Sequence, residues 1–161
     1  MNQVLVDQQI MLYDLALELA RYAYSIDEVP VGAVIYKKDT YEVIASGFNQ
    51  MKKLKSSLAH AEMQAIHNAM KRIKNERLIN CSIITTLEPC PMCAQAISFA
   101  RLSELHFSAE DKKSGGVFHG PKIFESSSCH YKPTINMIDD QGKSKKLLQM
   151  FFKNKRKNVQ N

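Results

Sequence analysis

The spacing of apolar residues in the first half of the chain changes from that of a helix to that of strands. Between residues 8 and 26, apolar side chains recur every three or four positions, which predicts an amphipathic helix that Pro30 prevents from continuing. Residues 31–36 and 41–48 are rich in β-forming residues and flank four polar residues, so they predict a hairpin. A second helix is expected over residues 61–73. The apolar stripe of the first helix is expected to consist of Leu12, Leu15, Leu19, Tyr22, Ala23 and Ile26.

The second half of the chain continues the alternation of strands and helices, which favours an α/β fold with helices on both faces of a sheet. A loop as long as residues 109–130, with three glycines, is usually functional in a compact domain. The 161 residues show no repeat and no linker, so we expect one domain. The other expected elements are a strand over 81–87, a short helix over 91–100, a strand over 104–108, an edge strand over 131–138 and a closing helix over 144–158.

Composition and charge narrow the functional classes. The formal net charge is +6, which favours anionic partners. No stretch approaches the ~20 apolar residues of a membrane span, and the first forty residues lack the basic start and apolar run of a signal peptide. We therefore expect a cytoplasmic protein, in which a C-x-x-C pair is metal-binding or catalytic rather than a structural disulfide.

Two short motifs carry the candidate chemistry. His60-Ala61-Glu62 stands thirty residues before Pro89-Cys90-Pro91-Met92-Cys93. One histidine and two cysteines form the ligand set of a zinc ion whose fourth position stays open. A glutamate beside the histidine can accept a proton from zinc-bound water. The combination H-x-E and P-C-x-x-C is the signature of zinc nucleobase deaminases.

Local geometry is compatible with this ligand set. Proline is favoured at the first helical position, so Pro91 places Cys90 beside a helix start and Cys93 in the first turn. The positive end of that helix favours anionic sulfur. His60 and Glu62 can face one ion only at a helix entrance, because residues two apart on a regular helix point in nearly opposite directions.

Each motif has a plainer interpretation when it is taken alone. The two cysteines could be an inert buried pair or a redox pair, and His60 and Glu62 could be surface residues at a helix start, where glutamate is favoured. Their combination predicts the deaminase chemistry, in which zinc-bound hydroxide attacks the ring carbon that bears the amino group and Glu62 shuttles protons.

Nearly the whole chain resembles the bacterial tRNA-specific adenosine deaminases. The segments that carry the resemblance, in family order, are Glu28-Val29-Pro30-Val31-Gly32-Ala33-Val34, Gly47-Phe48-Asn49, His60-Ala61-Glu62, Thr86 to Ala94, Asp111 to Gly116 and the tail from Leu147 to Phe152. The resemblance implies attack at C6 of adenosine, which gives inosine at the wobble position of a tRNA anticodon. It also implies a three-layer α/β/α sandwich around a five-stranded mixed sheet, one zinc per subunit and a homodimer.

The resemblance assigns substrate-binding roles as well. It implies that Asn49 hydrogen-bonds the target base and that Asp111 helps to hold the flipped-out nucleotide. The residues alone favour a turn residue at Asn49 and a solvated loop charge at Asp111. Where many relatives carry arginine before this aspartate, the chain has Glu110. His119, in the same long loop, is expected to cap the loop rather than touch substrate.

The closing helix supplies independent support for a nucleic-acid partner. It carries six basic residues and no acidic one. A basic stripe beside exposed aromatic rings suits phosphates and unstacked bases, so Phe152, Lys155 and Arg156 are predicted to contact tRNA. The alternative is that Phe151 and Phe152 pack in the core while the lysines only solvate the helix.

Two rival functions remain open from the sequence. The first is a deaminase of free guanine or cytosine: the Pro-Cys-Pro-Met-Cys motif also occurs in guanine deaminases, although the Asp111 segment and the basic tail argue against this function. A catalytically silent, zinc-stabilised RNA-binding subunit would typically lack the glutamate that is present here as Glu62.

Overall fold

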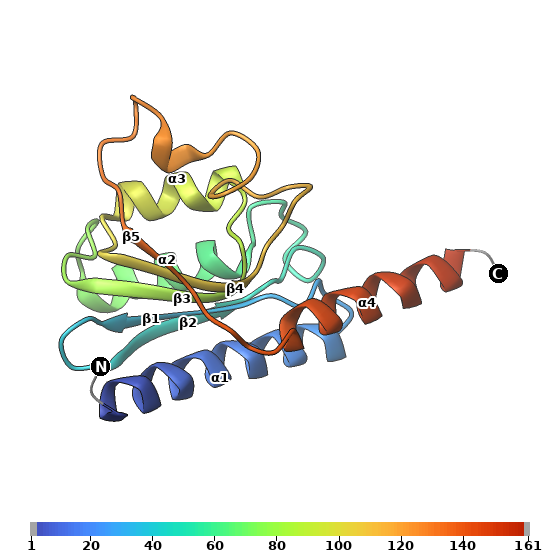
Figure 1. Cartoon of the computed structure of the whole chain (residues 1–161). Helices are drawn as coiled ribbons and strands as arrows, with labels where there is room; N and C mark the ends of the chain where they lie inside the picture. Colours follow the sequence, from blue (N-terminus) through green and yellow to red (C-terminus); the bar gives the residue numbers. More distant parts are fainter. Residues whose placement is uncertain (1–2, 160–161) are drawn as a thin grey trace.

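A five-stranded mixed sheet forms the middle layer of the structure, a computed structural model that describes residues 3–159 (Figure 1). The strands are β1 (Gly32–Lys37), β2 (Val43–Phe48), β3 (Cys81–Leu87), β4 (Glu104–Ala109) and β5 (Thr134–Met137), and their order in the sheet is β2-β1-β3-β4-β5. β1 is antiparallel to β2 and β3, whereas β3, β4 and β5 are parallel. The predicted α/β fold with a mixed sheet is confirmed.

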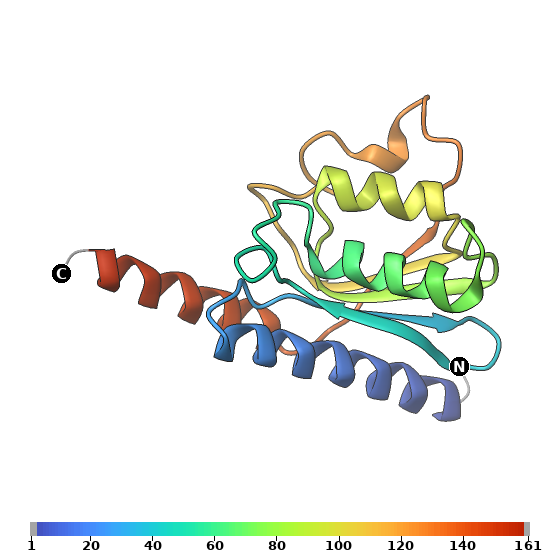
Figure 2. The same ribbon diagram turned by 180° about the vertical axis from the view of Figure 1, so that it is seen from behind.

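Helices cover both faces of this sheet (Figures 1 and 2). α1 (Gln3–Ser25) lies on one face, and α2 (Ala61–Ile73) and α3 (Pro91–Ala100) lie on the other. The short 3-10 helix η1 (Ile123–Glu125) packs against α3. α4 (Lys143–Val159) begins beside α1 and then projects away from the sheet. None of the described helices is both long enough and apolar enough to cross a membrane.

The face of α1 that packs on the sheet differs from the predicted stripe. Leu15, Tyr22 and Ile26 belong to that stripe but are 39%, 50% and 36% exposed. A Cβ atom at Gly32 would lie only 2.0 Å from the carbonyl oxygen of Ala16, so glycine allows β1 to approach this part of the helix closely. Close approach favours the face with small side chains. The buried face consists of Leu12, Tyr13, Ala16, Leu17, Ala20 and Ala23.

Two strands are shorter than predicted. Tyr41 has a φ of 59°, in the left-handed region that a strand does not use, and β2 begins only at Val43. β5 begins at Thr134, directly after Pro133, which has no N–H to donate to the ladder. The first difference arises from the backbone conformation of Tyr41, and the second from the missing donor at Pro133.

Candidate active site

His60 and Glu62 lie at the start of α2, as the motif requires. His60 is the N-cap residue, with an extended backbone (φ −70°, ψ 155°), and Glu62 is in the first turn. The change from extended to helical backbone lets both side chains face the same space. Gly47 of β2 permits this arrangement, because a Cβ there would lie 2.4 Å from the carbonyl oxygen of Ala61. The predicted helix entrance is confirmed.

Cys90 and Cys93 occupy the equivalent positions at the start of α3. Cys90 is the N-cap residue, again extended (φ −67°, ψ 169°), and Pro91 follows at the first helical position. Cys93 lies in the first turn and is fully buried. Among the described residues, neither His60 nor Cys90 makes a side-chain capping hydrogen bond, so both donor atoms are available to a ligand.

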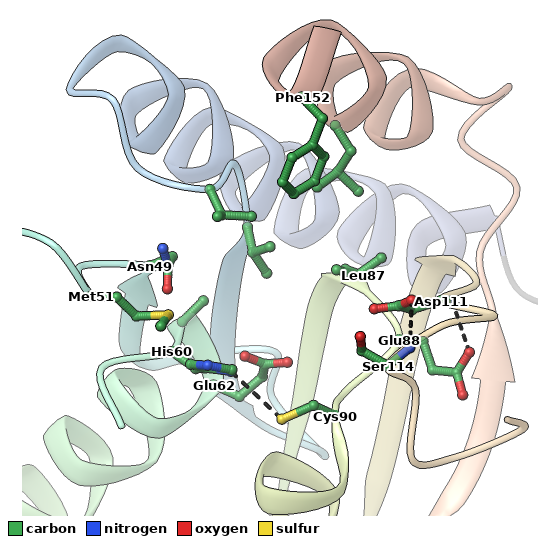
Figure 3. Close-up of a pocket in the computed structure, with 14 residues that line it drawn as sticks. Asn49, Met51, His60, Glu62, Leu87, Glu88, Cys90, Asp111, Ser114 and Phe152 are labelled. Atoms are coloured by element: carbon green, nitrogen blue, oxygen red, sulfur yellow. Dashed lines mark hydrogen bonds between the residues drawn. The ribbon is translucent and has the colours of Figure 1, made fainter. Parts of the chain in front are cut away.

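The two helix starts bring three donor atoms together. His60 Nδ1 lies 3.6 Å from the Sγ atoms of both Cys90 and Cys93. All three donors lie within 4.8 Å of one another, and Figure 3 shows two of these side chains beside Glu62. Ligands that bind zinc at 2.0–2.3 Å in a tetrahedron lie roughly 3.5–3.8 Å apart, so the cluster has the dimensions of a zinc site.

The protonation of the two thiols also favours a cation. The hydrogen bond with Cys93 lowers the pKa of Cys90 to about 4, and His60 acts in the same direction. The same contact, together with burial, raises the pKa of Cys93. Two thiols this close cannot both ionise without a positive charge between them. Because thiolates are the metal-binding form, a zinc ion would supply that charge.

The carboxylate of Glu62 lies directly beside this cluster, where it acts on His60 and Cys93. Only 4% of the residue is exposed. Burial raises the pKa of its carboxyl to about 7, and the negative charge of Cys90 adds to the increase. A carboxyl group with a pKa close to neutral can both accept and return a proton near pH 7.

A cavity of about 190 Å³ opens above Glu62 (Figure 3). Its walls are largely apolar, with Val29, Val31, Leu87 and Leu148 among the residues that line it. Its size is below the roughly 300–1,000 Å³ of sites for drug-sized ligands. The dimensions therefore suit one ring system rather than a long ligand.

Asn49 lies at the edge of this cavity and is 4% exposed. Its Nδ2 donates a hydrogen bond to Oε2 of Glu28 at 3.1 Å. This contact fixes the rotation of the amide, so that its oxygen points toward the cavity (Figure 3). Asn49 therefore presents a hydrogen-bond acceptor to the cavity and is more than a turn residue.

Asp111 lines the opposite side of the cavity. Its Oδ1 accepts hydrogen bonds from the backbone amides of Lys113 and Ser114, at 3.0 and 2.9 Å. Asp111 is therefore part of an ordered turn rather than a freely solvated charge, and Ser114 faces the same cavity.

The predicted contact residues of α4 point in different directions. Phe152 is 45% exposed and lines the cavity, whereas Phe151 is buried against Tyr24. Arg156 lines a second groove that continues from Phe152 along residues 109–113. Lys155 forms an ion pair with Asp27 on the other side of the helix. The structure thus brings two of the three predicted residues to the site.

Two buried glutamates next to the cavity were not predicted as site residues. Glu28 accepts hydrogen bonds from the amides of Lys52 and Lys53 in addition to Asn49. Glu88 accepts hydrogen bonds from several residues of the 111–119 loop. The only signal in the sequence was their presence in segments that match the deaminase motifs.

Comparisons with known proteins agree with this geometry. Residues 6–109 match the family model for the cytidine and deoxycytidylate deaminase zinc-binding region. The chain is 41% identical over 143 residues to the tRNA-specific adenosine deaminase of Agrobacterium fabrum, covering 89% of this chain and 93% of that protein. It is 38% identical over 144 residues to that of Aquifex aeolicus, again covering 89% and 93%.

A solved structure is similar over most of the chain. It comes from a study of A-to-I editing by tRNA:A34 deaminases, has a TM-score of 0.83 and 39% identity, and covers 86% of this chain and 99% of that one. A guanine deaminase structure from Bacillus subtilis is 34% identical but covers only 68% and 66%, with a TM-score of 0.59. The chain therefore belongs to the zinc-dependent cytidine and deoxycytidylate deaminase family and, within it, to the tRNA-specific adenosine deaminases.

Proposed function

We propose that this protein hydrolyses adenosine to inosine and ammonia at the wobble position of a tRNA anticodon. The observation that carries the proposal is the convergence of His60, Cys90 and Cys93 beside the buried carboxyl of Glu62, at the floor of a cavity that suits one base. The relatives named above support the choice of an RNA-borne adenosine.

His60, Cys90 and Cys93 would hold the zinc ion. When bound, zinc supplies a Lewis acid that lowers the pKa of water from 15.7 to about 7. Glu62 accepts the two protons of the attacking water in turn and delivers one to the ring nitrogen and the other to the departing ammonia. Its raised pKa, near 7, suits both directions of transfer.

The remaining cavity residues hold and orient the base. The amide oxygen of Asn49 is fixed by Glu28 and can accept a hydrogen bond from a base N–H group. The apolar walls exclude water and contact the faces of the ring. Phe152, at the cavity edge, offers an aromatic face on which a neighbouring base can stack. Asp111 holds the opposite wall in the turn that also positions Ser114.

The groove beside the cavity provides positive charge for the RNA backbone. Lys113, Lys145 and Arg156 line it together with Phe152, and these three cations outnumber the two carboxylates of the same lining, Glu110 and Asp111. Cations in a groove that adjoins the cavity suit the phosphates that flank a flipped-out nucleotide. Lys155 does not line this groove and pairs with Asp27, which also pairs with Lys52, so we assign Lys155 a smaller, long-range contribution.

We also propose that two copies of the chain form a homodimer that acts in the cytoplasm. Several large apolar side chains are exposed near α3 and the loop before α2: Leu54, Leu58, Phe99 and Phe118. Covering such side chains favours self-association. Sedimentation at several concentrations would test the dimer.

The activity is tested by offering zinc-loaded protein an anticodon stem-loop with adenosine at the wobble position. Free guanine, cytosine, adenine and their nucleosides serve as competing substrates, and ammonia release is measured for each. We expect ammonia only from the stem-loop, with inosine at the wobble position. Release from free guanine alone would instead support a small-molecule deaminase like the one from Bacillus subtilis.

A further inference from the structure

The carboxyl group of Glu88 is completely enclosed, and one loop supplies its hydrogen-bond donors. Only 2% of the residue is exposed. Oε1 accepts the backbone N–H groups of Val117, Phe118 and His119, at 3.1, 2.8 and 3.0 Å. Oε2 accepts the backbone N–H of Asp111 at 3.0 Å and lies 2.7 Å from Nδ1 of His119. Residues 111 and 119 are thereby both attached to one carboxyl group.

This 111–119 loop forms one wall of the active-site cavity, through Asp111 and Ser114. It contains no helix or strand. Its path is nevertheless fixed by close approach: a Cβ at Gly115 would lie 2.4 Å from Oε1 of Glu88, and one at Gly116 would lie 2.6 Å from the nitrogen of Pro91. The glycines therefore allow the loop to close tightly around the carboxyl group.

The proton-transfer chemistry assigned above makes no use of Glu88. The residue follows the last residue of β3, on the segment that leads to Cys90, so the carboxyl connects the metal-bearing segment to the substrate-facing loop. Charge-assisted hydrogen bonds from backbone amides are strong and directional. Such bonds can hold an irregular loop in its binding conformation before the substrate arrives, which removes the cost of ordering the loop during binding.

We propose that Glu88 is a positioning residue that fixes the 111–119 loop so that Asp111 and Ser114 receive the nucleotide at the cavity. This inference rests on the proposed function, since it concerns binding of the same RNA. Its effect should appear in substrate binding more than in the chemical step, because the side-chain hydrogen bonds described for Glu62 and the donor cluster join these residues to one another.

A second buried glutamate, Glu28, organises the loop on the opposite wall of the cavity in the same way. Glu28, 1% exposed, accepts N–H groups from Asn49, Lys52 and Lys53. Two buried carboxyl groups thus each organise one loop on either side of the cavity. This repetition distinguishes Glu88 from an ordinary buried residue that happens to lie near the site.

The direct test is the Glu88→Gln variant, in which one carboxylate oxygen becomes an NH₂ group that cannot accept from the loop amides. We expect the KM for the stem-loop to rise about tenfold while kcat falls by less than about threefold. Zinc should stay at one ion per chain. Glu104→Gln is the matched control: Glu104 is also a largely buried glutamate, paired with Lys38 and His106, but it does not line the cavity. It should leave KM unchanged.

A double-mutant cycle separates positioning from general stability. If Glu88 acts through the loop, Glu88→Gln should raise KM by a much smaller factor in a protein that already carries Asp111→Ala and Ser114→Ala. An equal rise in KM in both backgrounds would overturn the inference. A Glu88→Gln variant that lowers only kcat and zinc content would overturn it as well. If Glu88→Gln fails to fold, His119→Ala, which removes one donor from a partly exposed position, must still raise KM by about threefold.

The wild-type protein distinguishes the two levels of the proposal. A wild type that deaminates the stem-loop together with a Glu88→Gln variant of normal KM would overturn the positioning role alone. A zinc-loaded wild type that deaminates no RNA would overturn the proposed function, and the role of Glu88 in RNA binding with it.

Discussion

The donor cluster and helix α4 place their functional residues in opposite environments. At the cluster, His60, Cys90 and Cys93 converge from two helix starts, with every donor within 4.8 Å of the others. α4 projects from the fold, and adjacent residues of its basic segment face different partners: Lys155 pairs with Asp27, while Arg156 lines the groove. The loss of any one donor is therefore expected to disrupt the metal site. In contrast, the contribution of each α4 residue to RNA binding depends on the direction in which its side chain points.

The largest effect is expected from the loss of one donor. Cys90→Ser should remove most of the bound zinc and all measurable turnover, because a neutral hydroxyl replaces a thiolate ligand. Metal analysis and ammonia release on the same sample measure both effects. Cys129→Ser is the control, since Cys129 is buried beside Ser98 and the carbonyl of Tyr131. The Cys129→Ser protein should keep one zinc per chain. Full zinc content in Cys90→Ser would contradict the ligand assignment.

Glu62→Gln should greatly slow the chemical step while it leaves the cluster intact. Loss of a proton shuttle typically costs about 10²–10⁴-fold in rate, so kcat should fall in that range. Zinc content and affinity for the stem-loop should remain close to the wild-type values, because Glu62 is not a donor of the cluster. Single-turnover deamination separates the two effects. A variant that retains more than about a tenth of the wild-type rate would exclude Glu62 as the shuttle.

Within α4, the comparison of two neighbours is the sharpest test. Arg156→Ala should weaken binding of the stem-loop by about fivefold to tenfold at low salt, since it removes a cation from the groove. Lys155→Ala should weaken it by about twofold or less, because Lys155 does not line the groove and pairs with Asp27, a carboxylate that Lys52 also contacts. Binding curves at several salt concentrations would measure this, with a smaller salt slope for Arg156→Ala. Equal losses would mean that only the net charge of the helix matters.

The smallest effect is expected where α4 is anchored. Asp140 accepts hydrogen bonds from Tyr13 Oη at 2.6 Å and from the amide of Ser144 at 2.7 Å. Burial raises the pKa of Asp140, but these hydrogen bonds outweigh burial and hold the pKa below its ordinary value. The stabilisation is therefore complete above the unfolded-state pKa of about 3.9 and is lost as the pH falls through the lower folded-state pKa.

Asp140→Asn should consequently cost about 1–2 kcal/mol of unfolding free energy at pH 7 and progressively less below about pH 4. Urea unfolding at the two pH values measures the difference. Asp139→Asn is the neighbouring control, because Asp139 accepts only a local hydrogen bond from the amide of Gln141. A cost of Asp140→Asn that did not vary with pH would contradict an ionised anchor.

The contrast between the donor cluster and α4 also explains which features could be predicted from the sequence. Pro91 fixed the start of α3, and the polar loop before residue 61 indicated the start of α2, so local rules placed the three donors and Glu62 at helix starts. The fold class followed from the alternation of strands and helices, with every predicted helix and strand present.

Features that depend on packing between elements could not be predicted in this way. The buried face of α1 is selected by the contact between Gly32 and Ala16, which belong to different elements. The partner of Lys155 is Asp27, 128 residues away in sequence. The roles of Glu28 and Glu88 depend on backbone amides, which no residue type reveals. Local spacing determines none of these contacts.

The most direct test of the metal centre is X-ray absorption at the zinc edge on the purified protein. Three donors from two helix starts should give one zinc per chain, with two sulfur ligands at about 2.3 Å, one imidazole nitrogen at about 2.0 Å and one further light-atom ligand. Substoichiometric zinc, or a shell of four sulfurs that would have to recruit the buried Cys81 and Cys129, would contradict the account.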